Sequence, residues 1–162
     1  MQGTRIIYKP IGIIFSPFKD IEGVPIQPAG AEGVKGKVKV YSRYAKGLMS
    51  LDGFSHIILI YHFHLSKGYS LKVVPFLQDS EHGVFATRAP KRPNHIGISV
   101  VKVEKIWENH IDVTNIDIVD GTPLLDIKPY VGFFDNVREE KSGWLAERSG
   151  DINAVRSDKR FK

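Results

Sequence analysis

The feature that most constrains the fold of this chain is a series of short apolar runs separated by turn-forming residues. The runs do not alternate with long helices, as the strands of a parallel sheet would. Strands are predicted at residues 11–15, 38–40, 54–63, 71–76, 84–87, 98–103 and 111–118. The run at 54–63 is apolar apart from its histidines, which predicts a strand buried on both faces. Short strands in this number indicate a mainly β chain, built as an antiparallel barrel or sandwich.

One segment has the spacing of a helix rather than of a strand. Its apolar residues follow one another at intervals of three or four, which predicts a short amphipathic helix over 42–51: Tyr41, Tyr44, Leu48 and Leu51. Gly53 would end this helix. Residues 19–36 contain so many glycines and prolines that a loop is predicted there.

Length and composition describe one domain with a short extension. A chain of 162 residues is long enough for one substantial core. After about residue 137 the composition changes to a charge run at 138–141, a small apolar patch around Trp144 and a basic end. We therefore predict a barrel domain over 1–137 and a basic C-terminal tail over 138–162. Trp144 would dock this tail on the barrel or on a second subunit.

Composition also bears on where the chain works and what it meets. The absence of cysteine excludes disulfides, thiolate metal sites and cysteine nucleophiles, and it fits a cytoplasmic protein. No apolar run is long enough for a membrane helix, and the first residues lack the apolar core of a signal peptide. The excess of 23 Lys and Arg over 18 Asp and Glu suggests a polyanionic partner.

The most informative segment for function is FATRAPKRPNHIGISVV, residues 85–101. Between two apolar runs it concentrates three cations, Arg88, Lys91 and Arg92, in a loop that two prolines stiffen. A loop that proline has already ordered loses less entropy when it grips a ligand. Because all three cations are hydrogen-bond donors, the expected ligand carries a carboxylate or a phosphate. The alternative is a solvated basic loop.

The common signatures of nucleotide-binding and hydrolytic sites are absent from the sequence. It has no GxGxxG after a strand, no Walker loop, no GxSxG and no HExxH. His56, His62 and His64 share one face of the predicted strand at 54–63, but no carboxylate accompanies them. A structural or ligand-contacting role is therefore favoured over metal binding, and we predict no metal.

A second stretch with reactive groups is DGTPLLDIKPY, residues 120–130. Asp126, Lys128 and Tyr130 could share one face of a strand. A site that takes a proton from a weak nucleophile needs a carboxylate held by a cation, and a hydroxyl that positions the substrate. The alternative is structural: Asp120 caps a turn and Asp126 only pairs with Lys128.

Taken together, five segments resemble one family, the TsaA-like proteins: PIGIIFSPF (10–18), VPIQPAG (24–30), GFSHIILIYHFH (53–64), GVFATRAPKRPNHIGISVVKVE (83–104) and DGTPLLDIKPY (120–130). The resemblance covers residues 8–132 in the right order. The family consists of S-adenosylmethionine-dependent methyltransferases built on a β-barrel. Its characterised bacterial members methylate the base nitrogen of N6-threonylcarbamoyladenosine beside the tRNA anticodon. The resemblance therefore implies a small antiparallel β-barrel, S-adenosylmethionine as cofactor, tRNA as substrate and a homodimer.

The resemblance also implies which residues bind the cofactor. It assigns these positions to the S-adenosylmethionine pocket: Gln27, Pro28, His64, Leu65, Arg88, Ile98, Ser99, Asp126, Ile127 and Lys128. Arg88 suits the cofactor's carboxylate or a nearby acid. Lys91, Arg92 and Asn94 become candidate contacts of RNA.

The acceptor nitrogen is a poor nucleophile, because it is conjugated with both a purine and a carbamoyl group. Asp126, supported by Lys128 and Tyr130, is the candidate for positioning this nitrogen or removing its proton. Methyl transfer is an in-line displacement, so the protein has mainly to orient donor and acceptor.

Two departures from the family pattern keep alternatives open. His95 stands where family members often have proline, and the tail is not the larger extra domain of many bacterial members. That domain could help to dock RNA. The alternatives are a small-molecule methyltransferase on the same barrel and a non-catalytic barrel that binds S-adenosylmethionine or nucleic acid. Because both the RPN loop and the DIKPY segment are present, an active enzyme is favoured over the second alternative.

Overall fold

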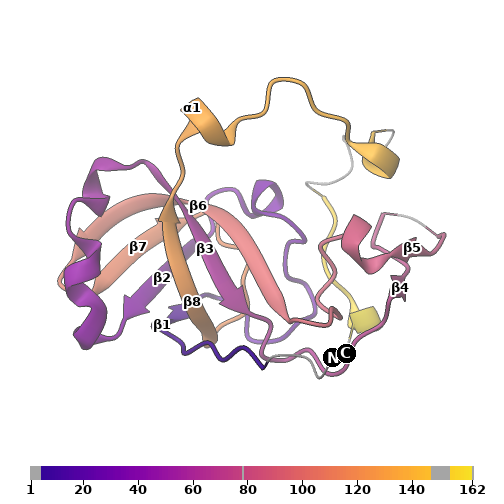
Figure 1. Cartoon of the computed structure of the whole chain (residues 1–162), viewed down its shortest axis with the longest axis horizontal. Helices are drawn as coiled ribbons and strands as arrows, with labels where there is room; N and C mark the ends of the chain where they lie inside the picture. Colours follow the sequence, from indigo (N-terminus) through magenta and orange to yellow (C-terminus); the bar gives the residue numbers. More distant parts are fainter. Residues whose placement is uncertain (1–4, 78, 147–153, 162) are drawn as a thin grey trace.

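The body of the protein is a closed β-barrel. The structure, a computed structural model, describes residues 5–77, 79–146 and 154–161. Six strands close the barrel in the order β1-β2-β7-β6-β3-β8, and neighbouring strands run antiparallel (Figure 1). Their bounds are β1 Gly12–Phe15, β2 Lys35–Val40, β3 His56–His62, β6 Ile96–Trp107, β7 His110–Thr114 and β8 Thr122–Pro129. The predicted mainly β fold, a small antiparallel barrel, is confirmed.

The core lies inside the barrel because alternate residues of each strand point inward. On β3, Ile57, Leu59 and Tyr61 are buried, whereas Ile58 and Ile60 are half-buried on the outer face. The prediction that the run at 54–63 is buried on both faces is therefore wrong. The strand is apolar throughout because its outer face carries isoleucines as well.

Two short 3₁₀ helices replace the helix predicted at 42–51. They are η2, Ser42–Leu48, and η3, Leu51–Gly53, and Leu48 is buried in the barrel core. Between them Ser50 adopts a φ of 67°, in the left-handed region. A helix cannot continue through that conformation, so the apolar spacing extends over two separate turns.

Two of the predicted strands differ in length or type. The run at 71–76 contributes only β4, Lys72–Val73, which pairs with β5, His82–Gly83. The run at 84–87 is a 3₁₀ turn, η4, Val84–Ala86. The hydroxyl of Thr87 donates to the carbonyl oxygen of Val84 at 2.9 Å, which closes the turn. Another 3₁₀ turn, η1, Pro28–Ala31, lies in the predicted loop at 19–36.

The predicted strand at 111–118 ends early, at Thr114. Asn115 follows it with a φ of 66°, a conformation that breaks a strand. Residues 116–121 then cross to the start of β8 at the end of the barrel.

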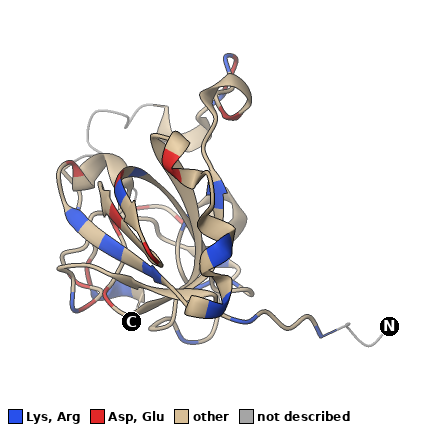
Figure 2. Cartoon of the chain, turned by 90° about the vertical axis from the view of Figure 1, so that its left-hand side faces the viewer, with Lys and Arg blue, Asp and Glu red and all other residues tan. Residues whose placement is uncertain are grey.

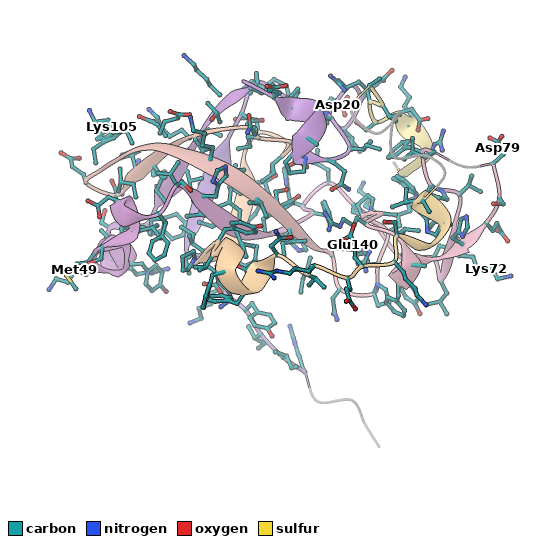
Figure 3. All side chains as sticks on the ribbon, turned by 90° about the horizontal axis from the view of Figure 1, so that it is seen from above. Asp20, Met49, Lys72, Asp79, Lys105 and Glu140 are labelled. Atoms are coloured by element: carbon teal, nitrogen blue, oxygen red, sulfur yellow. The ribbon has the colours of Figure 1, made fainter. Side chains whose placement is uncertain are left out.

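The chain beyond β8 leaves the barrel and returns to the body at its far end. It forms α1, Gly132–Asp135, then η5, Gly143–Leu145, and finally η6, Lys159–Phe161 (Figure 1). Figure 3 shows Met49 and Lys105 at the barrel end and Lys72 and Asp79 at the opposite end, with Glu140 on the connecting segment. No helix in the described part of the chain is long and apolar enough to cross a membrane.

Candidate functional site

A cavity of about 710 Å³ lies where one end of the barrel meets the loops and the C-terminal segment. Its walls come from loop 21–27, the residues that follow β3, residues 75–77 and 85–92, the start of β6, residues 117–119 and the C-terminal segment. The volume is in the range of small-molecule sites, and most of the lining side chains are apolar.

Two arginines of the cationic loop have different surroundings. Nη1 of Arg88 donates a hydrogen bond of 2.8 Å to Oε1 of Gln27, and both residues line the cavity. Nη1 of Arg92 instead donates to the carbonyl oxygens of Thr87 at 2.9 Å and Ala89 at 3.2 Å. Arg92 therefore fixes the shape of the loop, while Arg88 presents its remaining donors to the cavity.

A chain of hydrogen bonds that the sequence did not predict runs beside the cavity. The hydroxyl of Ser99 donates to Oδ1 of Asp117 at 2.6 Å, and Oη of Tyr61 lies 3.1 Å from the Ser99 oxygen. Because Ser99 has one proton and gives it to the carboxylate, Tyr61 is the donor to Ser99. Tyr61 and Asp117 both line the cavity, and Ser99 is the buried link between them.

Burial changes the acidity of this chain. It raises the pKa of Asp117 to about 6, and the hydrogen bond from Ser99 and the charge of Arg88 act in the opposite direction. Burial and, to a smaller extent, the Asp117 charge raise the pKa of the Tyr61 phenol well above its usual value. At neutral pH Asp117 is therefore a poorly solvated carboxylate, while Tyr61 stays protonated. Such a carboxylate is a strong hydrogen-bond acceptor for a ligand.

His64 stands beside the cavity as a neutral ring. The hydroxyl of Thr122 donates to the carbonyl oxygen of Val119 at 2.7 Å, so the contact of 3.2 Å between its oxygen and Nδ1 of His64 needs the proton on Nδ1. Burial and the neighbouring His62 lower the pKa of His64. The free lone pair on Nε2 is therefore available as an acceptor.

Gly97 leaves room for the Tyr61 ring. A Cβ atom at this position would overlap Cε2 of Tyr61 and would lie 2.8 Å from Cζ of Phe63. Only glycine lets the start of β6 approach these rings so closely. Ile98 follows on the outer side and lines the cavity, whereas the Ser99 side chain points inward.

The predicted cofactor residues divide into two groups. Five of them line the cavity: Gln27, His64, Leu65, Arg88 and Ile98. Two more do not line it: Pro28 begins η1 immediately after Gln27, and the Ser99 hydroxyl donates a hydrogen bond to the Asp117 carboxylate. The structure therefore brings together side chains from loop 21–27, from the end of β3 and from the cationic loop.

Four of the DIKPY residues lie on β8 and Tyr130 follows it directly, all outside this cavity. Oδ2 of Asp126 and Nζ of Lys128 are 2.9 Å apart, and the two residues pair with Ile60 and Ile58 of β3 on the outer face of the barrel. The side chain of Ile127 packs toward the core, and the Tyr130 ring contacts the His56 ring edge-on, with centroids 6.3 Å apart. The structure groups Asp126 with Lys128 but does not bring Asp126, Lys128 or Tyr130 to the cavity of their own chain.

The other loop residues lie around the start of β6. The carbonyl oxygen of Lys91 accepts a hydrogen bond from the Ser70 amide, and Asn94 is exposed. Nε2 of His95 lies 2.7 Å from the carbonyl oxygen of Gly68. This histidine, which stands in place of the family's proline, therefore ties the segment after β3 to the loop.

Sequence reasoning missed Asp117 because it treated 111–118 as one half-exposed strand, which would leave this carboxylate in solvent. The local pattern gave no signal of this, because in a continuous strand inward-facing Ile116 and Ile118 would place Asp117 on the outer face. Among the residues that the structure describes, no group of three or more His, Asp or Glu is arranged to hold a metal ion.

A closed barrel with an apolar pocket at one end, an arginine at its rim and a buried carboxylate on its wall is a small-molecule-binding barrel, suited to a ligand with both charged and apolar parts.

The model of the tRNA-methyltransferase O N-terminal domain matches residues 13–136. A probable S-adenosyl-L-methionine-binding protein of Pyrococcus abyssi is 50% identical over 156 residues, which cover 96% of this chain and 85% of the relative.

Two further comparisons extend to longer proteins. The tRNA (adenine(37)-N6)-methyltransferase of Homo sapiens is 34% identical over 143 residues, covering 84% of this chain and 32% of the human protein. The crystal structure of TrmO from Pseudomonas aeruginosa aligns with a TM-score of 0.74 at 35% identity, covering 87% of this chain and 63% of that one. The chain thus spans less than two thirds of these two proteins. It belongs to the TrmO family, and the resemblance to TsaA-like proteins drawn from its motifs is confirmed.

Proposed function

We propose that this protein is an S-adenosylmethionine-dependent methyltransferase that methylates N6 of threonylcarbamoyladenosine next to the tRNA anticodon. The observation that carries the proposal is the cavity in which the Arg88–Gln27 pair and the Asp117 carboxylate face the same space. Membership of the TrmO family supports the reaction class. The bound cofactor supplies an activated methyl group on a sulfonium centre.

The chemistry of the cavity fits this cofactor. S-adenosylmethionine carries one carboxylate, an ammonium group, a sulfonium, a ribose and an aromatic purine whose flat faces suit apolar contacts. Arg88 offers free guanidinium donors for the carboxylate, and the amide nitrogen of Gln27 is a further donor. Asp117 offers an acceptor for the ammonium group or the ribose hydroxyls, and the apolar walls suit the purine. The assignments of Pro28, Leu65, Ile98 and Ser99 belong to the same proposal.

The mouth of the cavity suits an extruded base. Phe85 is 73% exposed and Ile98 49% exposed, although both are large apolar residues that line the cavity. Exposed apolar groups that cluster at a pocket mark a binding surface. An enzyme that acts on a base inside structured RNA takes the base out of its stack and holds it between apolar or aromatic side chains.

Asp117 and Asp126 are the candidate acceptors of the proton, because Asp158, which also lines the cavity, is ion-paired with Arg160 at 2.8 Å. Asp117 stands in the cavity of its own chain. Asp126, with Lys128 and Tyr130, keeps its proposed role only if the outer face of β8 meets the cavity of a second copy. The half-buried Ile58, Ile60 and Val100 beside that carboxylate support such a homodimer. Light scattering that finds only an 18.2 kDa species at micromolar concentration would exclude the dimer, and with it this role of Asp126.

Cationic side chains support a polyanionic substrate. Lys35, Lys37 and Lys39 occupy alternate positions of β2 on the outer face, and Figure 2 shows Lys and Arg recurring along the barrel wall. Lys91 and Asn94 remain proposed RNA contacts, and Arg92 keeps this role through the guanidinium nitrogens that do not bind its own loop. A cytoplasmic location, where tRNA and the cofactor are both present, is part of the proposal.

The proposal is tested by incubating the protein with labelled S-adenosylmethionine and with tRNA that either carries or lacks the threonylcarbamoyl group. Only the modified tRNA should accept methyl. Binding without transfer is the second candidate function, since the relatives from Pyrococcus abyssi and Archaeoglobus fulgidus are named S-adenosyl-L-methionine-binding proteins. If calorimetry shows cofactor binding but neither tRNA is methylated, the result would favour binding without transfer. It would also be consistent with methylation of a small molecule.

A further inference from the structure

The C-terminal segment forms one wall of the cavity. We call its described residues, 143–146 and 154–161, the C-terminal clasp. Five of its side chains line the cavity: Trp144, Leu145, Ser157, Asp158 and Phe161. The match to the TrmO N-terminal domain ends at residue 136, so this wall lies outside the matched range.

The clasp holds the loop that carries Arg88. Nε1 of Trp144 donates a hydrogen bond of 2.8 Å to the carbonyl oxygen of Ala86, two residues before Arg88. The Trp144 ring stacks on His82 with centroids 4.7 Å apart and an angle of 22° between the planes. Phe161 is buried in a small apolar cluster with Val73, Val84 and Ala89. Residues 82–89 are thus fixed from both described parts of the clasp.

The clasp also holds the loop that carries Gln27. The amide of Ser157 donates to the carbonyl oxygen of Val24 at 2.8 Å, and the amide of Gly23 donates to the carbonyl oxygen of Ser157 at 2.8 Å. The Ser157 hydroxyl accepts from the Val24 amide at 2.9 Å and donates to the carbonyl oxygen of Ile21. Pro25 and Arg156 form an isolated antiparallel bridge.

The two loops meet through the hydrogen bond between Arg88 and Gln27, and the same clasp holds both. Neither loop contains more than short 3₁₀ turns and two-residue strands, so their own backbone bonding is sparse. Burial of the Phe161 ring and the hydrogen bonds of Trp144 and Ser157 both stabilise the docked arrangement. The clasp contacts are therefore a large part of what orders this side of the cavity.

We propose that the C-terminal clasp contributes to cofactor binding. In this arrangement Trp144 is a positioning residue, whose hydrogen bond to the Ala86 carbonyl oxygen fixes the position of Arg88. The inference rests on the proposed function only in taking S-adenosylmethionine as the ligand. A ligand that needs Arg88 and Gln27 in this arrangement binds better when the clasp is docked. By reciprocity, the bound ligand must then stabilise the docked clasp.

The two tryptophans of the chain allow a direct test. In Trp107→Phe, Trp144 is the only tryptophan left, and its emission should change saturably with S-adenosylmethionine, at the midpoint that calorimetry gives. Trp144→Phe keeps an aromatic ring but loses the N–H donor, so the dissociation constant should rise about 5- to 10-fold, as for one lost hydrogen bond. Trp144→Ala should weaken binding further, while Trp107→Phe should bind as the wild type does. At saturating cofactor, Trp144→Phe should have a kcat close to that of the wild type, because Trp144 positions the site and does not take part in the reaction.

Hydrogen exchange tests the clasp without any ligand. In Trp144→Ala and in Phe161→Ala, the amides of residues 21–27 and 82–89 should exchange faster together, while the barrel strands keep their protection. Faster exchange in only one of the two loops would overturn the proposal, and so would wild-type affinity in both Trp144 variants. If the wild type shows no heat with S-adenosylmethionine while both loops still loosen together, the proposed function fails and the structural part of the clasp stands.

Discussion

Replacing Asp117 by Asn should make the protein more stable at neutral pH while weakening cofactor binding. The pKa of this carboxyl is raised to about 6, from 3.8 in an unconstrained chain. The difference means that the folded state disfavours ionised Asp117 by up to about 3 kcal/mol. Asparagine has the same shape, and its amide oxygen can still accept the Ser99 hydrogen bond, but it carries no charge.

The pH dependence gives the sign of this effect. Well below pH 3.8 the carboxyl is protonated in both folded and unfolded chains, so its ionisation costs the fold nothing. As pH rises from about 4 through 6, the unfolded chain ionises first, and the wild type loses this stability. The advantage of Asp117→Asn should therefore be close to zero at pH 3, grow as pH rises through 4 to 6, and reach up to about 3 kcal/mol at pH 8. At pH 8 this corresponds to a rise in Tm of up to roughly 6–12 °C for a domain of this size.

Thermal and urea unfolding of both proteins at pH 4.5 and pH 8, with calorimetry for S-adenosylmethionine, would measure the effect. Asp126→Asn is the matched control, because its carboxylate pairs with Lys128 on the outer wall and should show no such gain at pH 8. An equal stability difference at both pH values, or a variant less stable than the wild type at pH 8, would refute the reasoning about burial.

Three further outcomes follow from the site. Arg88→Ala should weaken cofactor binding by roughly 10- to 100-fold, the scale of a lost charged hydrogen bond, and Arg88→Lys should restore only part of it because the planar fork is missing; isothermal calorimetry measures both. Gly97→Ala should cost about 1–3 kcal/mol in urea unfolding, because the new methyl group overlaps the Tyr61 ring. Phe85→Ala should leave stability almost unchanged, yet raise the KM for tRNA about 10-fold through lost stacking. The control is Phe133→Ala, at a side chain that is 96% exposed and does not line the cavity, and it should leave this KM unchanged. Steady-state methylation assays distinguish the two variants.

The barrel could be predicted from the sequence because short apolar runs indicate strands and the turn residues between them indicate where the strands end. Residues 98–103 and 38–40 fall within β6 and β2 as expected. The runs at 84–87 and 42–51 could not be assigned in this way. In the first, the Thr87 hydroxyl competes for the backbone, and in the second, Ser50 takes a left-handed conformation. Local hydrophobic spacing reports neither effect.

The charge of the loop indicated Arg88 as a ligand contact, but its partners in the site were predicted only through the motif resemblance. Gln27, His64 and Arg88 lie far apart in the sequence, and no spacing rule could have placed them around one cavity. Asp117 was not predicted, and for Trp144 only the docking of the tail was predicted, not its link to the cavity. Their roles depend on long-range contacts, with Ser99 in one case and with Ala86 in the other. The role of Asp126 stays a prediction, because its place on the outer wall reaches a substrate only through a second copy.

The most direct test of the account is methyl transfer by the wild type, Asp117→Asn and Asp126→Asn to tRNA with and without the threonylcarbamoyl group, followed by mass spectrometry of the nucleosides. The wild type should methylate only the modified adenosine. Asp126→Asn should abolish transfer while cofactor affinity stays within a few fold, and Asp117→Asn should lose affinity for S-adenosylmethionine. Failure of the wild type to methylate either tRNA would contradict the proposed function. Full activity of Asp126→Asn would remove that residue from the reaction and leave Asp117 as the base.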